Sequence, residues 1–277
     1  MDFFSEYIAP FILAVLQGIA EFLPISSSGH LVIVNQLMEV DKGIVFDLVL
    51  HLATLISVVC FYWRDIVEIF MGCIHELKPK QDKEKENLKF VGYLIVATAI
   101  TAVIGLCLDN YVETTLRKLP IVGILLIANA GILMASRKFN LFPASKDGAL
   151  TLKSSIVLGL AQGIAVLPGI SRSGSTITMA LLMGINKKDC AKISFLLSIP
   201  VILGAVILHL KDLNQFSSHN LVIILCASVV CAIVGYLSLV LLNKLLKRAS
   251  FHYFAPYCLV VGLICLVIST LRFSGVL

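Results

Sequence analysis

Two polar stretches in this strongly apolar chain carry side chains whose types and spacing suit phosphoryl chemistry. The first, QGIAEFLPISSSGH at 17–30, holds an acid, three serines and an imidazole, and the second, QGIAVLPGISRSGS at 162–175, holds an arginine between serines. Nucleophilic phosphoryl transfer requires a nucleophile with a base in reach and a cation that holds phosphoryl charge. The candidate catalytic residues are therefore Glu21, Ser27, His30 and Arg172.

Each stretch ends in Ser and Gly residues directly before a new helix is expected. Free backbone N–H groups and the positive end of a helix dipole should then point into a common cavity. Two such helix N-termini, together with the arginine, predict an anion site, with phosphate or diphosphate as the ligand. The candidate substrate-binding residues are Gln17, Ser26, Ser28, Ser171, Ser173 and Thr176.

The composition is that of an integral membrane protein. Of the 277 residues, 58% are hydrophobic and 14% are charged, whereas soluble domains are roughly 45–50% apolar and about 25% charged. We expect an all-α protein with a single membrane domain over 1–277, surrounded by membrane lipids. The eight cysteines show no paired spacing, so neither a disulfide framework nor a metal set is expected. The net charge of +5 follows membrane topology, and no nucleic-acid partner is expected.

Apolar runs bounded by charges predict about six full transmembrane helices, near 44–63, 90–108, 119–136, 189–210, 221–241 and 254–272. Two further apolar regions, 8–39 and 153–186, are too short for two spans of ~20 residues each. Pro, Gly and Ser break both in the middle, so we expect two re-entrant helical hairpins.

This topology determines which loops share a side of the membrane. Sixteen Lys and Arg residues lie on one side and five on the other; the richer side comprises the loops 64–89, 137–153, 187–192 and 242–252. Positive charge marks the cytoplasmic side, so both termini are expected outside. The charged stretch KPKQDKEKEN at 78–87 is interpreted as a solvated cytoplasmic loop.

The two polar stretches also reveal an internal duplication. At a constant offset of 145 residues, eight of their fourteen positions are identical. We place repeat one at about 8–136 and repeat two at about 153–272. Because the hairpins enter from opposite sides, the prediction is an inverted-topology repeat with its site at the repeat interface. Glu21 aligns with Val166, Ser27 with Arg172 and His30 with Ser175, so the two copies supply different chemistry.

Structural interpretations remain open for several of these residues. Glu21 is also the natural partner of a structural Arg172, and the serines are also natural helix caps. His30 is open to interpretation as a buried histidine with satisfied hydrogen bonds, or as the nucleophile itself. Asp47 and His51, one helical turn apart, are either a second polar pair at the cavity or interfacial residues.

At these motifs the sequence closely resembles the undecaprenyl-diphosphate phosphatase family, the bacitracin-resistance membrane proteins. QGIAEFLP, ISSSGH and LPGISRSGST match the family's three motifs, and the resemblance extends through almost the whole chain. It implies hydrolysis of undecaprenyl diphosphate, a polyprenyl diphosphate lipid, to undecaprenyl phosphate for cell-wall synthesis, with bacitracin resistance as a result. It further implies a site opening to the outer face of a bacterial cytoplasmic membrane, and a homodimer is an assembly that we consider.

The resemblance also implies a dependence on Mg²⁺ or Ca²⁺, with Glu21 and Gln17 as candidate ligands. The family's first motif often begins with Glu, so Gln17 leaves open whether a second carboxylate takes part. A transporter of undecaprenyl phosphate is the alternative function, because inverted repeats with broken helices also build alternating-access carriers. On that alternative, His30 and Glu21 would relay protons.

Overall fold

The computed structural model describes residues 3–40, 43–77, 85–138, 141–143, 148–209, 221–247 and 251–274. Within these ranges the chain is α-helical apart from turns and short connections, and it contains no strand. The expected all-α class is therefore confirmed. Most of the charged stretch at 78–87 lies outside the described residues.

The helices follow one another in two series. Before residue 140 the main helices are α1 (Ala9–Ala20), α2 (Ser27–Met38), α3 (Gly43–Phe61), α4 (Trp63–Glu76), α5 (Glu86–Tyr111) and α6 (Leu119–Ala135). After residue 150 they are α7 (Leu152–Ile164), α8 (Arg172–Leu182), α9 (Lys187–Leu208), α10 (Leu221–Lys247) and α11 (Ala255–Phe273). Short π-helical turns, η1 (Phe4–Ile8) and η2 (Val112–Leu116), precede α1 and α6, and the 3₁₀ turn η5 (Phe251–Phe254) precedes α11.

Four of the described helices are long and apolar enough to cross a membrane, and a fifth span results if the bent pair α3 and α4 counts as one. The four are α5, α9, α10 and α11. Helix α6 coincides with the span predicted at 119–136, but it has only 17 residues. A helix crosses about 30 Å of hydrocarbon with ~20 residues, so a multi-pass membrane protein is confirmed, while six spans stay a prediction.

The two predicted hairpins are helix–break–helix units. Helix α1 ends before a turn at 21–26 and α2 follows, while α7 ends before a turn at 165–171 and α8 follows. Both connecting turns are largely buried. Non-helical backbone at membrane depth must be buried in protein or line a polar cavity. The breaks therefore mark where the polar interior of this protein is to be found.

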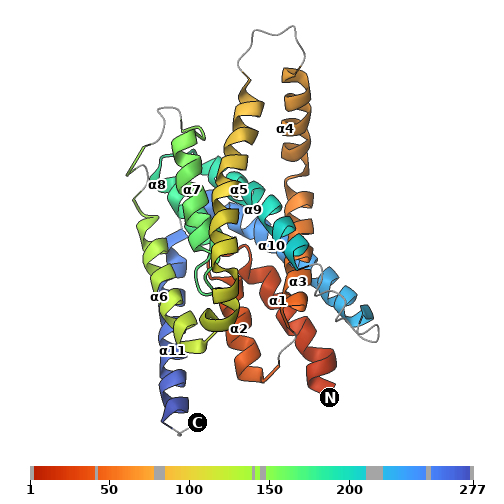
Figure 1. Cartoon of the computed structure of the whole chain (residues 1–277), viewed down its shortest axis with the longest axis vertical. Helices are drawn as coiled ribbons and strands as arrows, with labels where there is room; N and C mark the ends of the chain where they lie inside the picture. The colour runs from red at the N-terminus through yellow and green to blue at the C-terminus, as the bar shows by residue number, and fades with distance from the viewer. Residues whose placement is uncertain are drawn as a thin grey trace.

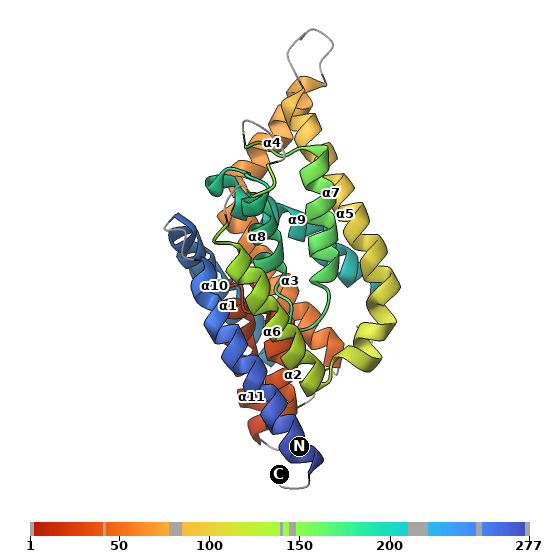
Figure 2. The same cartoon turned by 90° about the vertical axis from the view of Figure 1, so that its left-hand side faces the viewer.

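Packing brings both breaks to the centre of the bundle. Helix α1 packs along α10, α7 along α5, and α6 along α11 (Figures 1 and 2). Gly123 and Gly262 allow the last pair to approach closely, because a Cβ on Gly123 would lie 2.9 Å from the Gly262 carbonyl oxygen. The start of α1 and the end of α11 lie at the same end of the bundle (Figure 1).

The sequence prediction missed one helix. The sequence predicts a loop over 64–89, but Trp63–Glu76 forms α4, bent by 71° from α3. Trp63, Val67, Phe70 and Ile74 recur at helical spacing, and all four side chains are exposed. Interspersed charges obscure this amphipathic pattern in the sequence. The Glu76 carboxylate accepts hydrogen bonds from the backbone N–H groups that begin α5, which joins α4 and α5 into a hairpin.

Candidate active site

A serine caps each helix that begins after a break. Ser26 is the N-cap of α2, where its Oγ accepts a hydrogen bond from Gly29 N at 3.3 Å. Ser171 is the N-cap of α8, where its Oγ accepts from Gly174 N at 3.1 Å. The two caps are related by the 145-residue offset. Ser26 also has φ = 71°, a left-handed conformation that costs energy in a residue other than Gly.

Two buried side chains join the breaks to each other. The Ser26 Oγ accepts a second hydrogen bond from Gly169 N at 3.0 Å. From α6, the Asn129 Nδ2 donates to the Pro24 carbonyl at 3.0 Å, and its Oδ1 accepts from Ser171 N at 3.0 Å. Asn129 is fully buried. Because both ends of its amide bind backbone, it fixes the position of the α8 N-terminus relative to the first break.

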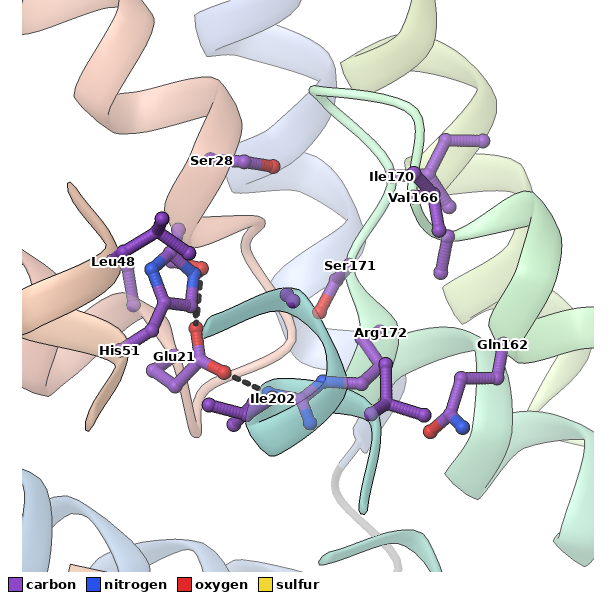
Figure 3. A pocket seen from close by; sticks show the side chains of 15 residues that line it. Glu21, Ser28, Leu48, His51, Gln162, Val166, Ile170, Ser171, Arg172 and Ile202 are labelled. Carbon is purple, nitrogen blue, oxygen red and sulfur yellow. Dashed lines mark hydrogen bonds and ion pairs between the residues drawn. The ribbon is translucent and has the colours of Figure 1, made fainter. Parts of the chain in front are cut away.

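Glu21 is the hub of the polar interior. Its Oε2 accepts hydrogen bonds from Ser27 Oγ at 2.6 Å and Gln17 Nε2 at 3.1 Å, while its Oε1 accepts from Arg172 Nη2. His51 Nε2 lies 3.6 Å from the same Oε2. Figure 3 shows the carboxylate between the imidazole and the guanidinium. The expected ion pair between the two breaks is thus present, and it is largely shielded from solvent, with side-chain exposures of 5% and 17%.

A cavity of about 210 Å³ opens beside this cluster. Its polar wall includes the N-terminal residues of both helices together with the hub (Figure 3), namely Glu21, Ser27, Ser28, His51, Gln162, Ser171 and Arg172. Its apolar wall comes from α3, α9 and the second break, with Leu48, Val166, Ile170, Val201 and Ile202 among its residues. The cavity therefore presents a charged floor next to hydrocarbon walls.

Arg172, which lines this cavity, has an unused donor. Its Nη1 is buried and has no hydrogen-bond partner among the described residues. A buried donor without a partner costs about 1–3 kcal/mol, and more when it is charged. An oxyanion in the cavity would satisfy it, with the N-termini of α2 and α8 adding their positive dipole ends.

His30 faces away from this cavity. Its Nδ1 donates to the Ser26 carbonyl at 2.8 Å, and its Nε2 accepts from the Tyr257 hydroxyl of α11 at 2.8 Å. The two rings are stacked with centroids 5.7 Å apart. In the described structure no hydrogen bond joins His30 to Ser27, so the sequence spacing put these two side chains in one turn without bringing them into contact.

The remaining candidates divide between cavity wall and support. Ser28 and Ser171 line the cavity, whereas Gln17, Ser26, Ser173 and Thr176 are buried outside its wall. Ser173 Oγ lies 3.1 Å from Ser171 Oγ, and Thr176 Oγ1 donates to the Arg172 carbonyl at 2.8 Å. Their contacts position the α8 N-terminus, and their roles in binding stay predictions.

His51 belongs to the site more clearly than the sequence indicated. Its Nδ1 donates to the Asp47 carbonyl at 2.7 Å, which leaves Nε2 directed at Glu21. Asp47 in turn accepts from Arg117 Nη2 at 2.6 Å. The spacing of Asp47 and His51, one helical turn apart, already indicated in the sequence that these two residues form a pair. Asn129, Tyr257 and Arg117 gave no such signal, because their partners lie far away in the sequence.

A polytopic helical membrane protein with a buried arginine and two helix N-termini at one cavity is the class of protein that the fold and the site define. The sequence matches the family "Bacitracin resistance protein BacA" over residues 10–264. It is 38% identical to "Undecaprenyl-diphosphatase" of Methanosphaera stadtmanae over 273 residues, covering 95% of this chain and 98% of that one. The "Undecaprenyl-diphosphatase" of Treponema denticola is 42% identical over 258 residues, covering 91% and 93%. The chain therefore belongs to the BacA family.

Proposed function

We propose that this chain hydrolyses undecaprenyl diphosphate to undecaprenyl phosphate and orthophosphate. The observation that carries this proposal is Arg172, which lines a cavity where two helix N-termini meet and whose buried Nη1 has no hydrogen-bond partner among the described residues. The names of the relatives supply the lipid and favour the enzyme over the transporter alternative. Such an activity returns a lipid carrier to cell-wall synthesis. It also lowers the amount of the diphosphate form, which is the form that bacitracin sequesters.

The charged floor and apolar walls of the cavity suit the two parts of this substrate. The terminal phosphoryl oxygens accept hydrogen bonds from Arg172 Nη1. Ser28 and the backbone N–H groups at the start of α2 and α8 surround them. The prenyl chain leaves along the wall formed by Leu48, Val201 and neighbouring apolar residues.

Ser27 is the nucleophile in this proposal, and Glu21 takes its proton. Ser27 Oγ attacks the terminal phosphorus, the bond to the bridging oxygen breaks, and undecaprenyl phosphate leaves. Glu21 passes this proton to the departing undecaprenyl phosphate and is again a carboxylate. Water then attacks the phosphoserine and gives a proton to Glu21, which passes it to the Ser27 oxygen as the bond from that oxygen to phosphorus breaks and orthophosphate is released. The 2.6 Å hydrogen bond between Ser27 and Glu21 supports Glu21 over His30 as the proton acceptor. His30 instead holds the break in place through Ser26 and Tyr257.

A divalent cation fits this site only as a companion of the substrate. Within the described residues no group of three or more His, Cys, Asp or Glu side chains is placed to hold a metal ion. Glu21 and the buried, unpartnered Oε1 of Gln17 are two oxygen donors on adjacent turns. Mg²⁺ is commonly held by one or two protein oxygens together with substrate phosphates. When bound, the ion would neutralise charge on the diphosphate oxygens.

The inverted repeat is part of the same proposal. In chain order, α1 corresponds to α7 and α5 to α10, and the observed packing of α1 on α10 matches that of α7 on α5. Such an exchange of partners is expected when two repeats are related by a pseudo-two-fold axis, and it supports the duplication. We further propose that the hairpins are re-entrant, that the protein lies in the cytoplasmic membrane, and that the cavity opens toward the outer face.

The test is phosphate release from undecaprenyl diphosphate by the purified protein in detergent, with and without EDTA. Arg172→Gln and Ser27→Ala should abolish release, while Ser28→Ala, in the same cavity wall, should lower it only about fivefold. EDTA should reduce release, and added Mg²⁺ should restore it. If the wild type releases no phosphate under any metal condition but moves undecaprenyl phosphate across liposome membranes, the transporter alternative is correct.

A further inference from the structure

A second cavity of about 230 Å³ adjoins the first. The two share five lining residues, Ser28, Leu48, His51, Val166 and Ala205, so they lie side by side. The second cavity reaches the C-terminal end of α5 and the N-terminal end of α6, where Asp109 and Arg117 line it. The end of α5 and the start of α6 lie toward the end of the bundle that carries the start of α1 (Figure 1).

Arg117 is the one Lys or Arg among the described residues that line this second cavity. Its backbone carbonyl accepts a hydrogen bond from Gln36 Nε2 of α2 at 2.9 Å, so the chain is anchored at this point. Its side chain is 30% exposed and therefore accessible from the cavity. A guanidinium carries five N–H donors in a planar fork that suits phosphate oxygens.

The pair that Arg117 forms with Asp47 is a single-point contact. Nη2 lies 2.6 Å from Asp47 Oδ2, while Asp47 Oδ1 is buried without a hydrogen-bond partner in the described structure. A carboxylate that closed a bidentate fork would use both oxygens. The guanidinium therefore retains donors for a second oxyanion, and Asp47 competes with that oxyanion for Arg117.

The other acid in this cavity has its own partner. Asp109 Oδ1 lies 3.8 Å from His209 Nε2. Arg117 is thus the group in the second cavity that is suited to an anion leaving the catalytic cavity. Direct passage of a phosphate dianion over hydrocarbon would be far more costly than transfer between two cationic sites.

We propose that the second cavity is an orthophosphate site on the exit route of the product, and that Arg117 exchanges Asp47 for the phosphate oxygens when the ion arrives. The proposal rests on the proposed function only for the origin of the ion. The site itself binds a phosphate dianion whether the ion comes from the catalytic cavity or from the medium.

The test measures binding of radiolabelled orthophosphate by equilibrium dialysis of the full-length protein in detergent. The starting variant is Glu21→Gln/Arg172→Gln, which removes both charges of the catalytic cavity and leaves the second cavity unchanged. In this background, adding Arg117→Gln should weaken orthophosphate binding about tenfold, the effect of losing one charge-assisted hydrogen bond. Adding Asp47→Asn instead should strengthen binding, because the competitor of the phosphate is removed.

Two further variants keep the test decisive. Lys118→Gln removes a neighbouring exposed cation and should leave binding within about twofold, because an exposed charge contributes little. Arg117→Gln/Asp47→Asn removes both members of the pair, leaves no unpaired acid, and should lose binding as Arg117→Gln does. Monodisperse elution and an unchanged melting temperature identify the folded variants.

Several outcomes would overturn the proposal. Equal loss in Lys118→Gln and Arg117→Gln would make the effect general electrostatics, and weaker binding in Asp47→Asn would make the pair structural. The effect of Arg117→Gln on the active protein is a further check. If this substitution raises KM for the lipid but does not weaken inhibition by orthophosphate, Arg117 contacts the bound lipid and not the product. Absence of phosphatase activity in the wild type would refute the proposed function alone, since the dialysis measurement does not depend on turnover.

Discussion

Replacing Glu21 by Gln tests whether the carboxylate neutralises Arg172 in the protein interior. The substitution keeps the shape of the side chain and removes its charge, so Arg172 is left with no anion. Its side chain is only 17% exposed. Removal of one member of a buried ion pair typically costs about 3–5 kcal/mol, because the remaining charge is uncompensated. We expect the free energy of unfolding to fall by roughly that amount.

The matched control is Asp189→Asn, another exchange of an acid for its amide. Asp189 lies 3.3 Å from Lys192, but these side chains are 39% and 29% exposed. Exposed pairs contribute about 0–1 kcal/mol. Denaturation of each variant in detergent micelles, followed by circular dichroism, gives both free energies under the same conditions. The contrast between the two losses measures burial, because the chemical change is the same.

The double variant Glu21→Gln/Arg172→Gln decides the cause of the loss. If the unpaired charge of Arg172 is responsible, the double variant should be more stable than Glu21→Gln alone. Orthophosphate should also stabilise Glu21→Gln, by about 2.7 kcal/mol at one hundred times its Kd. A double variant less stable than the single one, together with no effect of orthophosphate, would refute the assignment of Arg172 as a charge awaiting an anion.

Three further predictions concern the two breaks. Asn129→Leu should lower the free energy of unfolding by about 2 kcal/mol or more and reduce phosphate release, because two buried backbone groups lose their partner; equal melting temperatures would contradict this. Gly169→Ala should prevent folding, since Gly169 has φ = 116° and an added Cβ would lie 2.8 Å from a backbone oxygen. Gly131→Ala, which meets open space, should be neutral or stabilising, and comparing yields of monodisperse protein tests both. Ser27→Ala should lower kcat by roughly 10³-fold or more, and Ser28→Ala by about fivefold, measured as phosphate release; similar losses would remove Ser27 from the nucleophile role.

The helix breaks were predictable because their signals are local. The breaks contain Pro24, Gly169 and the cap serines. These residues end or begin helices through their own chemistry, whatever the surrounding sequence is. The pairing of Glu21 with Arg172 was one of the interpretations that the sequence left open, because charges in an apolar interior need partners. These inferences needed only residue types and spacing.

Contacts made by single polar residues from distant helices were not predictable in this way. Asn129 reaches Pro24 across 105 positions, and Tyr257 reaches His30 across 227. The spacing of Ser27 and His30 also misled, because it predicts a shared helix face and not the partner on that face. Ser27 is the first residue of α2 and turns to Glu21, while His30 bonds back to the N-cap carbonyl. Tertiary packing decides such choices.

The catalytic proposal finally explains why one acid suffices for a duplicated frame. Ser27 and Arg172 occupy positions related by the 145-residue offset, yet both donate to the same carboxylate, Ser27 to Oε2 and Arg172 to Oε1. The counterpart of Glu21 is Val166, which lines the cavity without charge. A second acid there would give Arg172 an anion for each edge of its guanidinium and leave no donor for phosphate. With the apolar Val166 at this position, Nη1 of Arg172 stays unpaired, and in the proposal Ser27, at the position equivalent to Arg172, uses the same Glu21 as its proton acceptor.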